Sequence, residues 1–231
     1  LTDMREALIV AAEPGELAGI LARCADVERG NLPVWFSRTG KLNGVRITAV
    51  ANGPGRELAA AAMDAVGGAD IVVSTGYCGA LDPALAPGDV LVASSVNGMP
   101  CERPVSGRPH STGDLASVCN VVTTAEEKKR LRTANGHSPV AVDMEAAAVA
   151  GAARKWGATF YCIRAIFDAA NESFSLDFNR LRDAQGRFSR PRILAAALAR
   201  PWSGVPELIR LDARGRRCAR ALGDFFADCK F

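Results

Sequence analysis

Short apolar runs alternate with longer segments of helical periodicity along most of the chain. Apolar runs of about four to eight residues are typical of buried strands, and apolar positions three and four apart are typical of helices. Strands are expected at residues 7–12, 45–50, 70–74, 89–94, 115–122 and 158–166. Helices are expected at residues 16–24, 56–66, 125–133, 143–156, 176–184, 191–200 and 206–228. Residues 97–113 are rich in Gly, Pro and Ser, which predicts a surface loop.

This alternation predicts an α/β fold. Strands that alternate with helices favour a three-layer arrangement around a largely parallel sheet. No internal repeat and no linker divides residues 1–231, so we expect a single domain with an arginine-rich helical region at about residues 190–231. Ligands of such folds bind at the carboxyl ends of the strands. Candidate functional residues should therefore follow the apolar runs.

Composition narrows the class of protein. Of the 231 residues, 48% are hydrophobic and 23% are charged, with a net charge of only +3, which excludes a disordered chain. No apolar stretch approaches the roughly 18 residues of a membrane-spanning helix. The seven cysteines are scattered and several lie inside apolar runs, which indicates reduced thiols and a cytoplasmic location. With only His110 and His137 and no Cys-x-x-Cys pair, neither a metal site nor a cofactor is predicted.

Charge is unevenly distributed. Residues 180–231 carry 12 Lys or Arg and 5 Asp or Glu, whereas residues 1–179 carry 16 and 20. Two interpretations of this basic, amphipathic region stay open, a packed terminal helix with a solvated basic side and a peripheral contact with an anionic membrane. Nucleic acid is the least favoured partner, because no stacking aromatic residues are interleaved with the arginines.

A glycine-rich segment, Gly76-Tyr-Cys-Gly79, follows the apolar run at residues 70–74. Such a segment after a buried strand lets backbone N–H groups approach a polar ligand, and it is also typical of a tight connection. It lacks the spacing of a dinucleotide fingerprint. The other glycine turn, Gly53-Pro-Gly55, lacks the ending of a phosphate loop.

Three acidic residues lie where a carboxylate is costly or well placed. Glu145 is in an alanine-rich segment expected to be a buried helix, next to Asp143, which is expected to cap that helix. Asp168 ends the apolar strand at residues 158–166, a position suited to a proton donor. Glu16 follows the first apolar run. The alternatives are ordinary first-turn acids for Glu145 and Glu16 and a turn-forming cap for Asp168.

Three segments together resemble the nucleoside phosphorylase/nucleosidase superfamily. Residues 75–92 are similar to its glycine turn with the following Gly-Asp and strand, and Val142-Asp-Met-Glu-Ala-Ala-Ala-Val149 is similar to its Met-Glu helix. Arg164-Ala-Ile-Phe-Asp168 is similar to its Arg-Ala-Ile-Ser-Asp strand end. The resemblance covers about residues 7–180. It implies a three-layer α/β/α domain with a mixed, partly barrel-like central sheet.

The resemblance also implies roles for individual residues. Met144 and Glu145 would lie against the ribose, with the Glu145 carboxylate accepting hydrogen bonds from its hydroxyls. Asp168 would protonate purine N7, which makes the base a neutral leaving group. The base and sugar pocket would include Gly76, Tyr77, Cys78, Gly79 and Phe167. The implied function is cleavage of the N-glycosidic bond of a purine, adenosyl-type nucleoside.

The nucleophile distinguishes hydrolysis from phosphorolysis. Phosphorylases of the family have an Arg before the glycine turn and a small hydroxyl residue within it, where this chain has Ser74 and Tyr77. A phosphate dianion beside Glu13 and Glu16 would lack a cation. Nucleosidases resembling methylthioadenosine/S-adenosylhomocysteine nucleosidase carry a water-activating Glu that Glu16 matches. Water is therefore the favoured nucleophile, with a purine nucleoside phosphorylase as the alternative.

Two departures from the family pattern concern the pocket. Phe167 replaces the usual Ser and Tyr77 replaces a smaller residue, which makes the pocket bulkier and more apolar. With the basic tail, these features resemble the hopanoid-associated phosphorylase-like branch, which implies an adenosyl-linked lipid substrate of hopanoid biosynthesis. Phe167 also keeps open a nucleoside-binding module that has lost catalysis. Family members form dimers or larger assemblies, so a homo-oligomer is expected.

Overall fold

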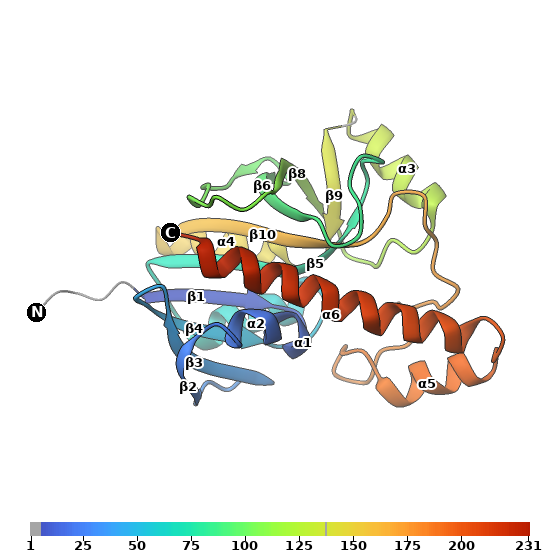
Figure 1. Ribbon diagram of the computed structural model, residues 1–231, viewed down its shortest axis with the longest axis horizontal. Coiled ribbons are helices and arrows are strands. Elements are labelled where there is room, and N and C mark those ends of the chain that lie inside the picture. The colour runs from blue at the N-terminus through green and yellow to red at the C-terminus, as the bar shows by residue number, and fades with distance from the viewer. Residues whose placement is uncertain (1–5, 137) are drawn as a thin grey trace, which may run out of the picture.

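A computed structural model describes residues 6–136 and 138–231 of the chain (Figure 1). His137, one of the two histidines of the chain, lies outside these residues. The strands are β1 (Glu6–Ala11), β2 (Ala25–Arg29), β3 (Phe36–Leu42), β4 (Val45–Ala51), β5 (Ile71–Ala80), β6 (Val90–Val96), β7 (Met99–Pro100), β8 (Ser111–Ser117), β9 (Pro139–Asp143) and β10 (Thr159–Asp168). The helices are α1 (Pro14–Leu21), α2 (Arg56–Val66), α3 (Ala125–Ala134), α4 (Ala146–Trp156), α5 (Arg190–Leu198) and α6 (Gly204–Asp228).

The central sheet is mixed and partly closed on itself. Its strand order is β10-β6-β8-β9-β5-β1-β4-β3-β2, and β10 also pairs with β5, so five strands form a ring. The pairs β10–β5 and β1–β5 are parallel, whereas β10–β6 and β5–β9 are antiparallel. The mixed, barrel-like sheet implied by the family resemblance is confirmed. The largely parallel sheet expected from the strand–helix alternation is wrong, because connections after β5 and β3 return the chain in the opposite direction.

Helices cover both faces of the sheet and make three layers (Figure 1). Helices α2 and α4 contact each other and bury Met63, Val149 and neighbouring alanines against one face. Helices α1 and α6 contact each other on the opposite face, where Leu17, Ile20, Leu222 and Phe225 are buried. Burying one apolar stripe of each helix against the sheet is what stabilises such a layered fold.

Two glycines bring α1 and α6 unusually close. A Cβ atom at Gly19 would lie 1.8 Å from the carbonyl oxygen of Ala219, and one at Gly223 would lie 2.3 Å from the carbonyl oxygen of Gly19. The backbones therefore touch at this crossing. Beside it, Arg23, which follows the end of α1, forms an ion pair with Asp224 of α6. The last long helix of the chain is thus fixed on the first one.

Several expected elements differ from those observed. Strands β2, β3, β7 and β9 were not expected, and the glycine-rich segment at residues 75–79 continues strand β5 instead of forming a turn. The loop expected at residues 97–113 contains β7 and the start of β8, which ends at Ser117 rather than at residue 122. The helix expected at residues 176–184 is wrong: this segment is irregular. The arginine-rich region contains α5 and α6, joined by a turn. In the described part of the chain, no helix is both long and apolar enough to cross a bilayer.

Candidate active site

Glu16 lies in the first turn of α1 and is directed back toward the sheet. Only 7% of the residue is exposed, so it is not an ordinary surface acid. Its Oε2 accepts hydrogen bonds from the N–H groups of Ala12 and Glu13, each at 2.9 Å, and its Oε1 accepts one from the N–H of Tyr77 at 2.9 Å. Burial raises the pKa of Glu16, while the backbone N–H groups and the charge of Arg164 oppose this rise. The carboxylate is held rigidly between β1 and β5.

The glycine segment of β5 makes room for this carboxylate. Gly76 has a φ of +127°, a conformation that L side chains rarely adopt. A Cβ atom there would lie 2.8 Å from Oε1 and 2.9 Å from Oε2 of Glu16. Glycine is therefore required at this position for two reasons, backbone conformation and space.

Asp168 occupies the end of β10 and is 5% exposed. It lies against Gly79, where a Cβ atom would be 3.1 Å from Oδ2. The register of β10 shifts between Ile166 and Asp168, which places Asp168 opposite Gly79. Glu16 and Asp168 thus lie beside two glycines of the same short segment of β5.

Asp168 forms a buried ion pair with Lys128 of α3. Burial raises the pKa of Asp168, and the charge of Lys128 opposes that rise. Sequence analysis did not identify Lys128, because it lies in a helix in which most other charged residues are exposed. Its burial depends on the turn after β10, which packs over it in the folded chain and leaves no signal in the local sequence.

Glu145 is the N-cap residue of α4 and is 7% exposed. Its Oε1 accepts a hydrogen bond from the N–H of Gly55 at 2.6 Å, which joins the Met-Glu segment to the turn before α2. Burial, and then the charge of Asp143, raise the pKa of Glu145 to about 8, against the lowering effect of Arg164. A carboxyl group in this position belongs to a polar cluster rather than to a solvated helix end.

A buried arginine organises the polar cluster. Arg164 of β10 is 1% exposed, forms an ion pair with Asp143, and donates hydrogen bonds to Ser74 Oγ at 2.9 Å and to the carbonyl oxygen of Thr75. Asp143 also accepts a hydrogen bond from the N–H of Ala146 at 2.9 Å. Asp143 ends β9 and is not the N-cap residue of α4, but it accepts this hydrogen bond from the first N–H of the helix, and Arg164 neutralises its charge.

Residues 177–189 cover the site beside Met144. Arg182 donates to the carbonyl oxygen of Pro54 at 3.3 Å and contacts the sulfur of Met144 at 3.6 Å. Arg187 donates to the carbonyl oxygen of Asn52 at 3.3 Å and lies over the ring of Trp35. This irregular segment takes the place of the expected helix and lies over Met144 and the glycine turn at residues 53–55.

The two bulky pocket candidates form a stacked pair. The rings of Tyr77 and Phe167 are 5.4 Å apart and nearly parallel, and the Tyr77 hydroxyl donates to the carbonyl oxygen of Gly215 at 2.7 Å. Both side chains therefore link this edge of the sheet to α6. Cys78, another predicted pocket residue, is buried in the core cluster on the α2–α4 side.

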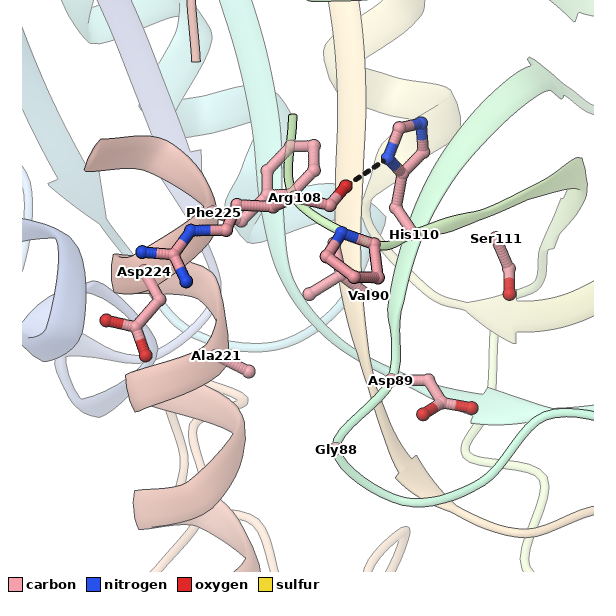
Figure 2. Close-up of a pocket in the computed structure, with 10 residues that line it drawn as sticks. Gly88, Asp89, Val90, Arg108, His110, Ser111, Ala221, Asp224 and Phe225 are labelled. Carbon is pink, nitrogen blue, oxygen red and sulfur yellow. Dashed lines mark hydrogen bonds between the residues drawn. The ribbon is translucent and has the colours of Figure 1, made fainter. Parts of the chain in front are cut away.

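A cavity of about 440 Å³ lies apart from these acidic residues. It is bounded by α6 and by the starts of β6 and β8, and Figure 2 shows Arg108, His110 and Asp224 around it. Asp224 is paired with Arg23, and Asp89 accepts a hydrogen bond from the N–H of Ala86 at 2.8 Å. None of the predicted site residues lines it. Among the described residues, no group of three or more His, Cys, Asp or Glu is placed to hold a metal ion.

The chain is similar in sequence to one protein family and to several nucleosidases. The Phosphorylase superfamily matches residues 6–112. The 5′-methylthioadenosine/S-adenosylhomocysteine nucleosidase of Shewanella loihica is 23% identical, covering 83% of this chain and 98% of the relative. That of Geobacillus thermodenitrificans is 25% identical, covering 82% of this chain and 95% of the relative.

Solved structures have the same fold over the whole chain. The S-adenosylhomocysteine nucleosidase of Streptococcus pyogenes, in complex with 5-methylthiotubericidin, has a TM-score of 0.68 at 21% identity and covers 100% of this chain and 99% of its own. Futalosine hydrolase of Helicobacter pylori has a TM-score of 0.67 at 18% identity, covering 96% and 95%. The first half of the chain is thus similar to the Phosphorylase superfamily, and its ring-closed sheet is the fold of these nucleosidases.

Proposed function

We propose that this chain is an N-ribosyl hydrolase that cleaves the N-glycosidic bond of a purine, adenosyl-type nucleoside. The observation that carries the proposal is the burial of Glu16, Glu145 and Asp168, each of which is held by backbone N–H groups or by a lysine. Buried carboxyl groups in fixed positions are costly to folding unless they are used. The nucleosidases among its relatives support the reaction type.

The three acids have separate roles in this proposal. Glu145, beside Met144, accepts hydrogen bonds from the ribose hydroxyls. Asp168 gives a proton to purine N7 while the C1′–N9 bond breaks and its electron pair stays with the base. Water adds to C1′, and Glu16 takes the proton that the water loses. The products are the free purine and the ribose of the nucleoside.

The surroundings of Glu16 support water as the nucleophile. Glu16 and Glu13 follow β1 together, and burial and the neighbouring Glu16 raise the pKa of Glu13 to about 7. Arg164, the buried cation nearest the glycine segment, is already paired with Asp143. A phosphate dianion here would meet two acids. Phosphorolysis remains the alternative, because the charges of Arg187 and Arg190 reach Glu13 and lower its pKa.

The test is adenine release from methylthioadenosine, S-adenosylhomocysteine and adenosine in phosphate-free buffer. Hydrolysis predicts adenine and free sugar without phosphate, and unchanged rates when phosphate is added. Dependence on phosphate and formation of ribose-1-phosphate would identify a phosphorylase. Binding of these nucleosides without release of adenine would identify a non-catalytic module.

The finer proposal concerns the 5′ substituent, which we assign to a lipid, an adenosyl-linked intermediate of hopanoid biosynthesis. Four exposed apolar residues in α5, in the turn after it and at the start of α6 support it: Leu194, Leu198, Trp202 and Ile209, between 54% and 95% exposed. Exposed apolar groups in a basic segment suit the surface of an anionic membrane. We further propose a cytoplasmic protein that forms a homo-oligomer, which light scattering would test.

Two measurements test the lipid assignment. Turnover of adenosylhopane should exceed that of methylthioadenosine, and the protein should co-float with anionic vesicles but not with neutral ones. Trp202→Ser should reduce flotation, with Ser203→Ala as the matched control. Turnover of methylthioadenosine alone, without vesicle binding, would contradict the assignment.

A further inference from the structure

A fully buried lysine lies beside the proposed proton donor. Lys128 is 1% exposed, whereas the next residue, Lys129, is exposed. Its ammonium group pairs with the Asp168 carboxylate and donates to the carbonyl oxygens of Ala169 at 2.6 Å and Glu172 at 3.0 Å. Three oxygens from one turn of chain therefore surround a single ammonium group.

The turn after β10 is organised to hold this arrangement. The Glu172 carboxylate accepts a hydrogen bond from the N–H of Ala169 at 2.9 Å and pairs with Arg214 of α6. The start of α3 is fixed to the same turn, because the N–H of Ala125 donates to Ser173 Oγ at 2.9 Å. Lys128 and Asp168 are thus constrained from both sides.

Stability alone does not account for such a pair. Removing an ammonium group and a carboxylate from water costs several kcal/mol per ion, and apolar residues of similar volume often serve a core as well. The pair therefore calls for a second role, and the position of Asp168 indicates which one.

We propose that Lys128 is a positioning residue that orients Asp168 and stabilises the carboxylate that Asp168 becomes when its proton passes to purine N7. The inference rests on the proposed function. The proton leaves the Asp168 carboxyl for N7 as the C1′–N9 bond breaks, and Lys128 keeps its own proton throughout. Solvent then restores the proton to Asp168.

Four charged or titratable groups act on Asp168. Lys128 of α3 and Arg214 of α6 lower its pKa, and Glu172 of the following turn raises it. Cys78 of β5 also interacts with it electrostatically, and the burial of Asp168 is the largest influence, in the upward direction. Lys128 is the only one of these that forms an ion pair with Asp168 among the described residues.

The kinetic experiment compares Lys128→Met, Lys128→Arg and, as control, Lys129→Met. Lys128→Met should lower kcat/KM about 10- to 100-fold. It should also move the alkaline limb of the pH profile of kcat/KM to higher pH by about one unit or more, because the charge that lowers the pKa of Asp168 is gone. Lys128→Arg should retain the wild-type limb. In an Asp168→Asn background, Lys128→Met should change kcat/KM less than about 3-fold. Equal losses in both backgrounds with an unmoved limb would overturn the proposal.

A second measurement does not depend on turnover. Calorimetry of adenine binding at pH 8, in two buffers of different ionisation enthalpy, counts protons taken up. Wild-type protein should take up about one proton per adenine, and Lys128→Met less than half as much, because loss of the Lys128 charge raises the pKa of Asp168 and leaves more of it protonated before adenine binds. Equal uptake would refute the role of Lys128. Wild-type binding with this uptake but without hydrolysis would refute the proposed function alone.

Discussion

The carboxylate of Glu16 lies directly against the backbone of Gly76, with room for no further atom between them. The same close approach recurs three residues later between Asp168 and Gly79. Gly76 and Gly79 of β5 therefore leave space for the carboxylates of Glu16 and Asp168. This relationship explains why a strand continues through a segment whose composition is typical of a turn.

Gly76→Ala should displace Glu16 and strain the backbone. We expect kcat/KM to fall about 100-fold, as for other small displacements of a reacting group, and the free energy of unfolding to fall by about 1–3 kcal/mol. Gly151→Ala is the control: Gly151 lies within α4 with nothing within 4 Å of its added Cβ. That change should stabilise the protein by up to about 1 kcal/mol. Full activity of Gly76→Ala would contradict the tight fit.

Glu16→Gln should abolish water activation with little change in shape. An amide offers one acceptor oxygen where the carboxylate serves N–H groups with both, and it is not a base. A loss of about 100- to 10,000-fold in kcat is expected. Glu57→Gln, in the exposed first turn of α2, should leave adenine release unchanged. Hydrolysis by Glu16→Gln at the wild-type rate would exclude Glu16 as the base.

Arg164→Met should strongly destabilise the protein, because it leaves Asp143 as a buried charge without its ion-pair partner. Breaking such a pair costs about 3–5 kcal/mol, measurable as a lower midpoint in urea. Adding Asp143→Asn should recover part of the loss, since the amide oxygen retains the cap on α4. Arg154→Met, on the exposed side of α4, should shift stability by less than about 0.5 kcal/mol. A similar small effect at Arg164 would show that the cluster is solvated.

Stability should depend on pH through Glu145. Its pKa is raised to about 8 from the usual 4.5, so the folded state binds this proton more tightly than the unfolded state. The contribution is complete below about pH 4.5 and is lost as the pH rises to about 8, by at most roughly 1.4 kcal/mol per pH unit. The Tm of the wild-type protein relative to that of Glu145→Gln should therefore fall as the pH is raised from 5 to 8.5, because the amide does not titrate. A difference independent of pH would contradict this burial.

Elements with a strong local pattern were predictable from the sequence. The expected helix at residues 56–66 matches α2, because a glycine turn begins it, an apolar face sustains it and Gly67 ends it in a left-handed conformation. The apolar strands β1, β4, β6 and β10 were located for a similar reason. By contrast, β2 is exposed along its length, and its sequence has no alternation of apolar and polar residues that would predict a strand. Its partner β3 contains mostly polar residues. Both strands therefore depend on hydrogen-bonded pairing with neighbouring strands rather than on a local hydrophobic pattern.

The segment at residues 176–184 illustrates a competition that sequence patterns do not resolve. Asp177 and Asp183 accept hydrogen bonds from the N–H groups of Asn179 and Gln185, at 3.1 and 2.9 Å, which favours turns over a helix. Asn179 is further bound to the backbone of Val121. The ion-pair partners of Asp168 and Asp143 were not predictable for a related reason. Lys128 and Arg164 meet these acids only when segments far apart in the sequence pack together.

The crossing of α1 and α6 at Gly19 and Gly223 has a consequence for biosynthesis. Glu16 belongs to a helix made early by the ribosome, yet the surface against which that helix rests is translated late. The nascent polypeptide therefore contains Glu16, Glu145 and Asp168 before the helix that completes their surroundings has been made. A premature stop codon upstream of Gly223 should yield an inert product, and catalysis should begin only once α6 has emerged from the exit tunnel.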